Sequence, residues 1–249
     1  MSGDGEGMIR RIALTRAQDD AEATAAELAA RGYEAVIAPA IEIRALPAAP
    51  PEGRFDALVA TSPRAIWALR DGDRARLASL PLHVAGARAA DAAAKAGLAL
   101  VGEPAADAAA LAERLARTLP PGARLLYLAG RDRKPTLEGA LAAAGLIVQA
   151  VEVYVAEARG AWSLPEAEAV AACDSALHYS RRTAGLAIGL AARAGLAEHF
   201  RALLHVCLSA DVAEPLAAAG AKQIVAAAAP DEAHLLAALE RACDASPKG

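Results

Sequence analysis

The chain has 249 residues, a formal net charge of −4 and a pI near 5.8. The acidic balance excludes a general electrostatic attraction to nucleic acid, and an aromatic content of 3% supplies few stacking surfaces for single strands. Although 55% of the residues are hydrophobic, no uncharged apolar stretch reaches the ~18 residues of a membrane span, and no basic region leads into an apolar one as in a signal peptide.

Three cysteines, Cys173, Cys207 and Cys243, are widely spaced and form no C-x-x-C pair. Their odd number predicts buried free thiols in a reducing compartment, so we expect a cytoplasmic protein. The sequence shows no large apolar stripe beyond the faces expected to form the core, and so gives no sign of a subunit interface. We therefore expect a monomer. The glycine-rich leader 1–7 predicts disorder, with Met8 as an alternative start.

Short apolar segments alternate with helix-like segments along the chain. Strands are predicted at 10–15, 34–38, 56–61, 82–85, 98–101, 124–128, 147–153, 175–179, 204–208 and 223–226. Helices are predicted at 19–31, 63–70, 88–96, 106–117, 136–144, 181–193, 211–219 and 231–242. This alternation predicts an α/β fold of parallel sheets with helices on both faces.

Helix-end signals support these boundaries. Ser62, followed by Pro63, and the aspartates Asp107 and Asp231 are predicted N-caps. Four glycines just past predicted helices suit the left-handed C′ position: Gly32, Gly97, Gly145 and Gly220.

The elements contain a duplication that runs out of order. Three pairs of segments match: 55–62 with 173–180, 107–115 with 231–239, and 12–16 with 125–131. The segment 12–16 begins its copy, whereas its match 125–131 comes at the end of the other copy. We therefore predict two similar parallel-sheet α/β domains, one inserted in the other, with a ligand cleft between them.

Two segments join the copies, and both alternate apolar and polar residues with period 2. The segments 39–44 and 150–156 are therefore predicted to pair as linker strands, which gives a two-stranded β-ladder hinge. Domain 1 is then discontinuous, covering 1–38 plus 157–249, and domain 2 covers 45–149.

Polar and basic residues follow many of the predicted strands, and in a parallel sheet these junctions share the carboxyl edge where ligands bind. Helix-start amides, hydroxyls and arginines at such an edge favour anions. The sequence therefore predicts a multiply anionic ligand. The candidate binding residues are Arg16, Thr61, Ser62, Arg64, Gly86, Arg131, Ser180, Arg182 and Ser209.

Other motifs for chemistry are missing from the sequence. The five histidines show no metal-ligand spacing, and neither a G-x-x-x-x-G-K-[ST] loop nor a G-x-S-x-G elbow occurs. We expect no metal and no cofactor. An enzyme built this way must work by holding a reactive substrate in a defined geometry.

The motifs, in their order and spacing, resemble those of the uroporphyrinogen-III synthase family. The resemblance runs from Ile9 to about Ala242, and its carriers are Leu14-Thr15-Arg16, 55–65, Val84-Ala85-Gly86, Gly130-Arg131-Asp132, 151–154 and 208–213. It implies two α/β domains joined by a two-stranded β-ladder, in agreement with the permuted duplication.

The resemblance also implies a reaction. The family's substrate is hydroxymethylbilane, a linear tetrapyrrole with eight carboxylates, and its product is uroporphyrinogen III. Water leaves the hydroxymethyl group of ring D to give an azafulvene, ring D is inverted through a spiro-pyrrolenine, and the macrocycle closes. The resemblance implies a lyase that needs no cofactor or metal, and no nucleic acid or membrane. Because the substrate also closes spontaneously without inversion, orientation and electrostatics must direct the outcome.

By resemblance, Tyr154 matches the family's linker-strand tyrosine and is the candidate acid for hydroxyl departure, with interdomain packing as the alternative role. Thr61, Ser62 and Arg64 match one binding loop, and Ser180 matches its counterpart in the other domain. We expect these residues, with Gly86 and Ser209, to bind acetate and propionate groups. Arg16, Arg131 and Arg182 are further candidates.

Two other functions fit two similar domains around a hinge. A cytosolic module that binds a polyanionic small ligand without chemistry would show the same organisation. A nucleotide-dependent α/β enzyme is disfavoured because the phosphate-binding loop is missing. The isomer of the porphyrin formed from hydroxymethylbilane distinguishes the synthase from the binding module.

Overall fold

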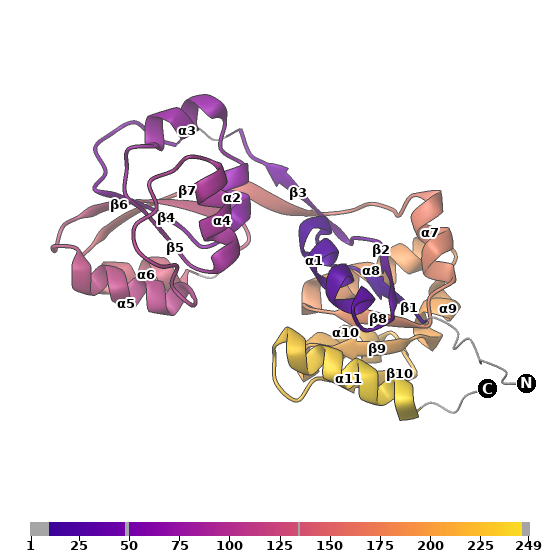
Figure 1. The fold of residues 1–249 in the computed structure, drawn as a ribbon. Coiled ribbons are helices and arrows are strands. Elements are labelled where there is room, and N and C mark those ends of the chain that lie inside the picture. Colours follow the sequence, from indigo (N-terminus) through magenta and orange to yellow (C-terminus); the bar gives the residue numbers. More distant parts are fainter. Residues whose placement is uncertain (1–9, 48–49, 134, 246–249) are drawn as a thin grey trace, which may run out of the picture. The chain divides into compact units, whose positions relative to one another are not determined.

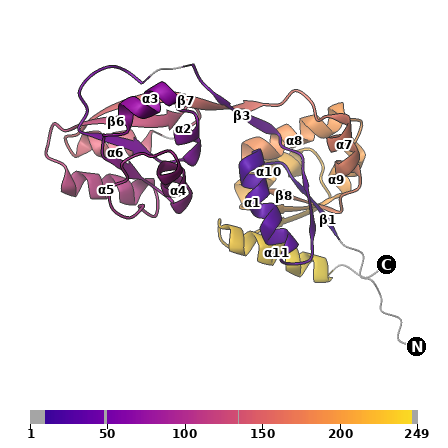
Figure 2. The ribbon, with the colours of Figure 1, turned by 45° about the horizontal axis from the view of Figure 1, so that its top comes forward.

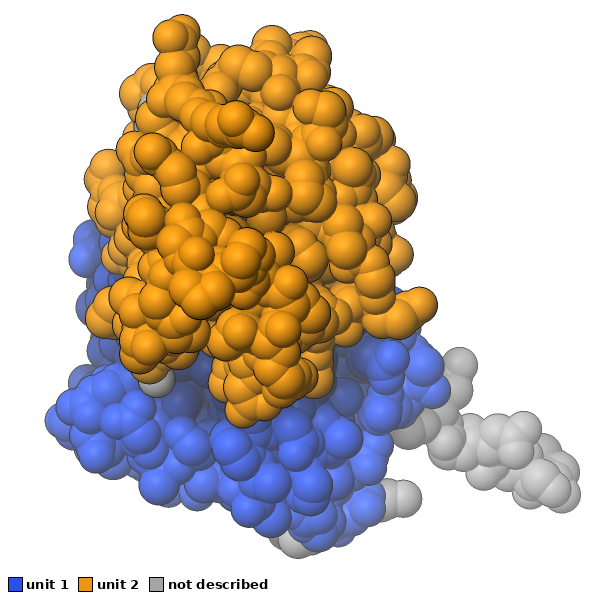
Figure 3. All heavy atoms as spheres, turned by 90° about the vertical axis from the view of Figure 1, so that its left-hand side faces the viewer, with its two compact units in different colours: residues 1–42, 157–249 blue, residues 43–156 orange. Residues whose placement is uncertain are grey.

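The structure, a computed structural model, describes residues 10–47, 50–133 and 135–245 (Figure 1). It consists of two compact units: unit 1 comprises Met1–Glu42 and Glu157–Gly249, and unit 2 comprises Ile43–Ala156 (Figure 3). Unit 2 is thus an insertion in the chain of unit 1. The leader 1–7 and the choice between Met1 and Met8 lie outside the described residues.

Unit 1 is a five-stranded parallel sheet in the order β10-β9-β8-β1-β2. Its first part contains β1 (Arg11–Leu14), α1 (Gln18–Ala29) and β2 (Glu34–Ile37). After the insertion come α7 (Leu164–Ala171), β8 (Ser175–His178), α8 (Arg181–Arg193), α9 (Ala197–Ala202), β9 (Leu204–Cys207), α10 (Ala210–Ala218), β10 (Gln223–Ala226) and α11 (Glu232–Ala245). Helices α1 and α11 pack on one face of the sheet and α7 to α10 on the other (Figure 2).

Unit 2 holds a second sheet in the order β3-β7-β6-β4-β5. Its elements are β3 (Ile41–Ala45), β4 (Ala57–Ala60), α2 (Pro63–Trp67), α3 (Asp71–Leu77), β5 (Leu82–Val84), α4 (Ala87–Lys95), α5 (Ala108–Thr118), β6 (Arg124–Gly130), α6 (Thr136–Ala143) and β7 (Ile147–Ala158). Side chains of α2, α3 and α4 form the core on one face, and those of α5 and α6 form the core on the other.

The two sheets have the same topology from different starting points. Counted in chain order, unit 1 has strand order 2-1-3-4-5, the flavodoxin-like arrangement. Unit 2 has order 2-1-3-4 when β6 is counted first, so β6, β7, β4 and β5 correspond to β1, β2, β8 and β9. The predicted fold class and its permuted duplication are confirmed.

The chain passes between the units within two hydrogen-bonded strands. Leu46 N donates to Val153 O at 2.8 Å, and Arg159 N donates to Ala40 O at 3.0 Å. The residue numbers increase from Ala40 to Leu46 on one strand while those of their partners decrease from Arg159 to Val153. The strands β3 and β7 are therefore antiparallel. The predicted two-stranded β-ladder is therefore present.

The helix-end signals act as predicted. Ser62 accepts from Arg64 N in the cap of α2, and Asp107 accepts from Ala110 N in the cap of α5. Asp231 accepts from His234 N at 2.9 Å, just before α11. All four predicted C′ glycines have φ between 68° and 83°, where a side chain would be strained.

The predicted strand at 98–101 is wrong. This segment forms only an isolated bridge between Leu82 and Leu100, followed by another between Ala85 and Ala105. Gly102 has φ +66 and Pro104 has no amide hydrogen, so both residues interrupt a regular ladder at the fifth place of the sheet.

Three helices, α3, α7 and α9, were not predicted. A signal for α7 was present in the sequence, because Ser163 and Glu166 form a capping box with Pro165 in the first turn. Arg159 also forms an ion pair with Glu166 at 2.6 Å and holds the pKa of that carboxyl well below its usual value, at about 2. Helices α3 and α9, with seven and six residues, are too short for a clear hydrophobic period.

Two histidines are fully buried in unit 1 between β8, β9 and Phe200. His205 Nε2 faces Phe200 O at 2.8 Å and therefore carries the proton, which leaves His205 Nδ1 to accept from His178 Nε2 at 2.9 Å. His178 Nδ1 is then an acceptor without a partner among the described residues. Burial lowers the pKa of both rings, because an imidazolium would lose its hydration there.

The buried pair predicts acid sensitivity of folding. As the pH falls below about 6.5, the unfolded chain binds protons that the folded chain does not, so the free energy of unfolding decreases by up to about 1.4 kcal/mol per pH unit and histidine. Urea unfolding between pH 7.5 and 5.0 should show this loss. His178→Leu should lower stability at pH 7.5 yet reduce the pH slope by about half, since one of two titrating rings is gone. An unchanged slope would contradict the role of the pair.

Candidate active site

The predicted site residues of unit 1 follow three adjacent strands of its sheet. Arg16 lies after β1, Ser180 and Arg182 lie at the start of α8 after β8, and Ser209 lies after β9. Since these strands are parallel, the residues share the carboxyl edge of one sheet. The strand order reverses between β1 and β8, so Arg16 and Ser180 flank the topological switch point.

The predicted residues of unit 2 lie on or after four adjacent strands. Tyr154 lies on β7 and Arg131 follows β6. Thr61, Ser62 and Arg64 follow β4, and Gly86 follows β5. The structure therefore brings the predicted residues of each unit together at that unit's own sheet edge, and the switch point of unit 2 lies between β6 and β4.

The three serines are helix caps. Ser62, Ser180 and Ser209 accept from backbone amides of α2, α8 and α10 at 3.3, 3.2 and 3.4 Å. A hydroxyl that accepts in this way still has a proton to donate, so a cap and a ligand contact are compatible. Ser180 Oγ also lies 2.8 Å from Thr183 Oγ1.

Gly86 is the N-cap residue of α4, where the backbone adopts a left-handed conformation. Its φ of +83 is left-handed, and an added Cβ would meet nothing within 4 Å, so conformation rather than space requires glycine. Its amide donates to Ala105 O at 2.8 Å. A ligand carboxylate would have to compete with that bond for the Gly86 amide.

Arg16 is already surrounded by protein groups. Its guanidinium lies 3.8 Å from the centroid of the Tyr179 ring, 3.4 Å from Glu232 and 3.7 Å from Asp20. Nη1 also donates to Thr24 Oγ1 at 3.0 Å. Two carboxylates compensate one cation here, which weakens Arg16 as a receptor for a further carboxylate.

Glu232 is the centre of this cluster. One of its oxygens, Oε1, accepts from Thr24 Oγ1 at 2.7 Å and from Tyr179 Oη at 2.9 Å, in addition to Arg16. Burial raises the pKa of Tyr179 well above its usual value, so the phenol keeps its proton and donates it.

A second cluster surrounds Arg131 in unit 2. Arg131 Nε lies 3.1 Å from Glu152, and the same carboxylate receives Arg133 Nη1 at 3.4 Å. The hydrogen bond from Arg131, ahead of that from Arg133, lowers the pKa of Glu152. Arg133 Nε pairs with Glu138 at 2.7 Å. Two arginines of the β6–α6 loop therefore face carboxylates from α6 and β7.

Tyr154 is half-buried, and its ring lies directly over the backbone of Gly130. A Cβ built on Gly130 would come within 2.6 Å of Tyr154 Cζ and 2.7 Å of Oη. The register of β6 against β7 shifts between Ala129 and Gly130, and Arg131 N donates to Tyr154 O at 2.9 Å. A bulge in the ladder thus places the tyrosine at the end of β6.

Sequence reasoning missed one hydroxyl pair. Tyr127, on β6 and only 4% exposed, has its Oη 2.9 Å from Thr61 Oγ1. Burial raises the pKa of Tyr127, which therefore remains protonated. A tyrosine inside an otherwise apolar strand, as in Leu125-Leu126-Tyr127-Leu128, was the available signal, since its hydroxyl needs a partner.

Within the described residues, no group of three His, Cys, Asp or Glu could hold a metal ion. Across the same part of the chain, no helix has the length and apolar character needed to cross a membrane.

Comparisons with known proteins point to one family. The family model described as uroporphyrinogen-III synthase HemD matches residues 22–237. Comparison with curated protein sequences finds no match. The fold is similar to that of uroporphyrinogen-III synthetase from Helicobacter pylori, with 17% identity, a TM-score of 0.61, and coverage of 96% of this chain and 100% of that chain. A mutant uroporphyrinogen III synthase from Thermus thermophilus shows 20% identity, a TM-score of 0.47, and coverage of 95% and 100%.

The contact between Gly130 and Tyr154 predicts a coupled effect on stability. Gly130→Ala should destabilise the protein by about 1–3 kcal/mol, because the new methyl displaces a packed ring. In a Tyr154→Ala background the same change should cost less than half as much. Gly139→Ala is the matched control, since a Cβ there meets nothing within 4 Å. Urea denaturation of the natural protein, the two single variants and the double variant measures the cycle. Equal costs of Gly130→Ala in both backgrounds would contradict the contact.

Proposed function

Because the chain belongs to the uroporphyrinogen-III synthase family, we propose that it is a cofactor-independent lyase that dehydrates and cyclises hydroxymethylbilane with inversion of ring D. The family makes uroporphyrinogen III in porphyrin, tetrapyrrole and haem biosynthesis, and the family match over residues 22–237 is the observation that carries the function. Hydroxyls and arginines at the carboxyl edges of both sheets support it, because the substrate is a chain of carboxylates.

We assign the departure of water to Tyr154. In the proposed step the ring D C–O bond breaks and the hydroxyl leaves as water with a proton from Tyr154 Oη. The lone pair of the pyrrole nitrogen forms the azafulvenium cation, and its N–H proton then passes to the Tyr154 phenolate, which gives the neutral azafulvene and restores the phenol. The support is the position of Tyr154 at the end of β6 beside Gly130, where the backbone allows close approach. A phenol is a weak acid near neutral pH, so its contribution is moderate.

We assign carboxylate binding to the hydroxyls and arginines of the edge loops. Thr61, Ser62, Arg64 and Ser180 lead this set, with Gly86, Arg182 and Ser209 beside them. Arg16 and Arg131 already face protein carboxylates, so a substrate group there must exchange one partner for another. These contacts hold the bilane in shape, which is the orientation effect that selects the inverted closure.

We further propose a cytoplasmic monomer. Support for a reducing compartment comes from Cys173, Cys207 and Cys243, which are free and buried. Burial raises the pKa of Cys173 and Cys207 to about 12, so these thiols are unreactive packing groups. Size-exclusion chromatography with light scattering tests the monomer.

The isomer of the product tests the function. With freshly prepared hydroxymethylbilane, the protein should yield the type III porphyrin after oxidation, because spontaneous closure gives only type I. Chromatographic separation of the isomers measures the ratio. Type I alone, at the spontaneous rate, would favour the binding module, which the family match does not favour.

Tyr154→Phe tests the assigned acid. Turnover should fall about 10- to 100-fold, the range of a positioned proton donor, while the unfolding midpoint stays within a few degrees. The control is Tyr33→Phe, which removes a half-buried phenol hydroxyl next to β2 in unit 1. Unchanged turnover in Tyr154→Phe would reassign Tyr154 to packing.

A further inference from the structure

The switch points of the two units carry the same kinds of side chain. In each unit a hydroxyl residue directly follows the equivalent strand, Thr61 after β4 and Tyr179 after β8, and directly precedes a capping serine. Each hydroxyl faces a second hydroxyl of the complementary type, Tyr127 at 2.9 Å and Thr24 at 3.3 Å. The Thr–Tyr pair is thus present twice, with its members exchanged.

An arginine accompanies each pair. Arg16, in the β1–α1 loop, lies 3.8 Å from the Tyr179 ring centroid, and Arg133, in the equivalent β6–α6 loop, lies 5.9 Å from the Tyr127 ring centroid. An acid at the third residue of the following helix holds each arginine, Asp20 in α1 and Glu138 in α6. Both tyrosines lie on corresponding sheet faces, Tyr179 on the α1/α11 face and Tyr127 on the α5/α6 face.

The units differ in the carboxylate that meets the hydroxyl pair. In unit 1 the carboxylate of Glu232 accepts from both hydroxyls and from the arginine. In unit 2, within the described residues, the hydroxyls of Thr61 and Tyr127 have only each other, and Arg133 Nη2 has no partner. In the part of the chain that the structure describes, no carboxylate is hydrogen-bonded to this hydroxyl pair. Glu138 and Glu152 pair with Nε and Nη1 of Arg133, which leaves Nη2 as its donor for a ligand.

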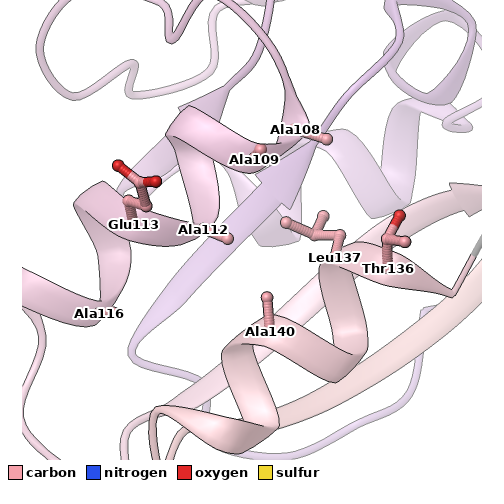
Figure 4. Close-up of a pocket in the computed structure, with 8 residues that line it drawn as sticks. All are labelled: Ala108, Ala109, Ala112, Glu113, Ala116, Thr136, Leu137 and Ala140. Atoms are coloured by element: carbon pink, nitrogen blue, oxygen red, sulfur yellow. The ribbon is translucent and has the colours of Figure 1, made fainter.

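The sequence shows which residue of unit 2 stands at the position of Glu232. The segments 107–115 and 231–239 match, and each begins with an aspartate N-cap, so Ala108 stands at the position of Glu232. Ala108 lines a cavity of about 410 Å³ between α5 and α6. Figure 4 shows Leu137 and Ala140 of α6 pointing toward the alanines of α5. In unit 1 the equivalent position carries the part-exposed side chain of Glu232, whereas in unit 2 the small side chain of Ala108 leaves room beside α6.

We propose that Thr61, Tyr127 and Arg133 form a subsite for one aliphatic carboxylate of the substrate, which binds where unit 1 holds the carboxylate of Glu232. The assignment rests on the proposed function for the identity of the ligand. Tyr127, which keeps its proton, donates to Thr61, and the Thr61 proton then points to the ligand, so the two bonds strengthen each other. Arg133, whose charge Glu138 and Glu152 already compensate, adds a bond from Nη2.

The decisive variant restores the missing group. Ala108→Glu places a carboxylate against the subsite and should raise the KM for hydroxymethylbilane at least about 10-fold, the size of a lost hydrogen bond to a charged group. Its kcat should change less than about 3-fold, and its unfolding midpoint should be equal or higher, because the new carboxylate meets the donors that Glu232 meets in unit 1. Ala108→Gln is the matched control of the same size without the charge.

A second variant removes the cation instead. Arg133→Gln should raise KM about 10-fold in the natural protein but much less in the Ala108→Glu background, because the subsite is then already filled. The dissociation constant of uroporphyrinogen III, kept reduced, should change in parallel with KM. Equal KM values for Ala108→Glu and Ala108→Gln, or full additivity with Arg133→Gln, would overturn the subsite.

Failure of the proposed function is distinguishable from failure of the subsite. If the natural protein neither forms the type III isomer nor binds uroporphyrinogen III, the ligand assignment is lost with the function. The subsite itself is then tested by thermal unfolding. The Ala108→Glu variant should unfold at a higher temperature than the Ala108→Gln variant only while Arg133 is present.

Discussion

Parallel pairing at the centre of each sheet is the constraint on which the candidate site depends. Strand β1 pairs with β8 and β6 pairs with β4, residue by residue and in the same direction. Within each sheet the residues at the carboxyl ends of these strands therefore come together, Arg16 with Tyr179 in unit 1 and Thr61 with Tyr127 of β6 in unit 2. All residues of β4 and β8 are buried, so a slip of one residue would turn Thr61 to the opposite face of its sheet and separate it from Tyr127.

Local signals were sufficient for most of the fold. Ser62-Pro63 and the cap at Asp107 mark helix starts through contacts of three residues or fewer, so their sequence alone is informative. The duplication was also readable, because apolar strands and capping serines repeat in a permuted order. The prediction of a strand at 98–101 is wrong because Gly102 and Pro104 follow the segment and interrupt pairing. A pattern of apolar residues does not show whether a neighbouring strand supplies the hydrogen bonds of a ladder.

The partners within the site were less predictable, because they are distant in the chain. Thr61 and Tyr127 are 66 residues apart, and Arg16 and Glu232 are 216 apart. The sequence placed arginines at the sheet edges correctly. It could not show that Asp20 and Glu232 compensate Arg16 or that Glu152 compensates Arg131. A junction motif identifies the edge of a sheet, whereas the charge available to a ligand depends on helices that arrive from elsewhere.

This compensation suits the chemistry of the family. The carboxylates of the bilane are the same before and after cyclisation, so contacts to them stabilise substrate and product alike and do not by themselves lower the barrier. Uncompensated arginines would add affinity for both and slow release of the product. Hydroxyl pairs next to charge-compensated arginines instead orient the substrate carboxylates while binding them with modest affinity. A reaction whose outcome depends on the position of ring D requires such orientation. Divergence between the two copies then has a physical meaning. At one switch point the carboxylate of Glu232 accepts from the hydroxyl pair and stabilises the fold, and at the other the pair of Thr61 and Tyr127 serves a carboxylate of the substrate.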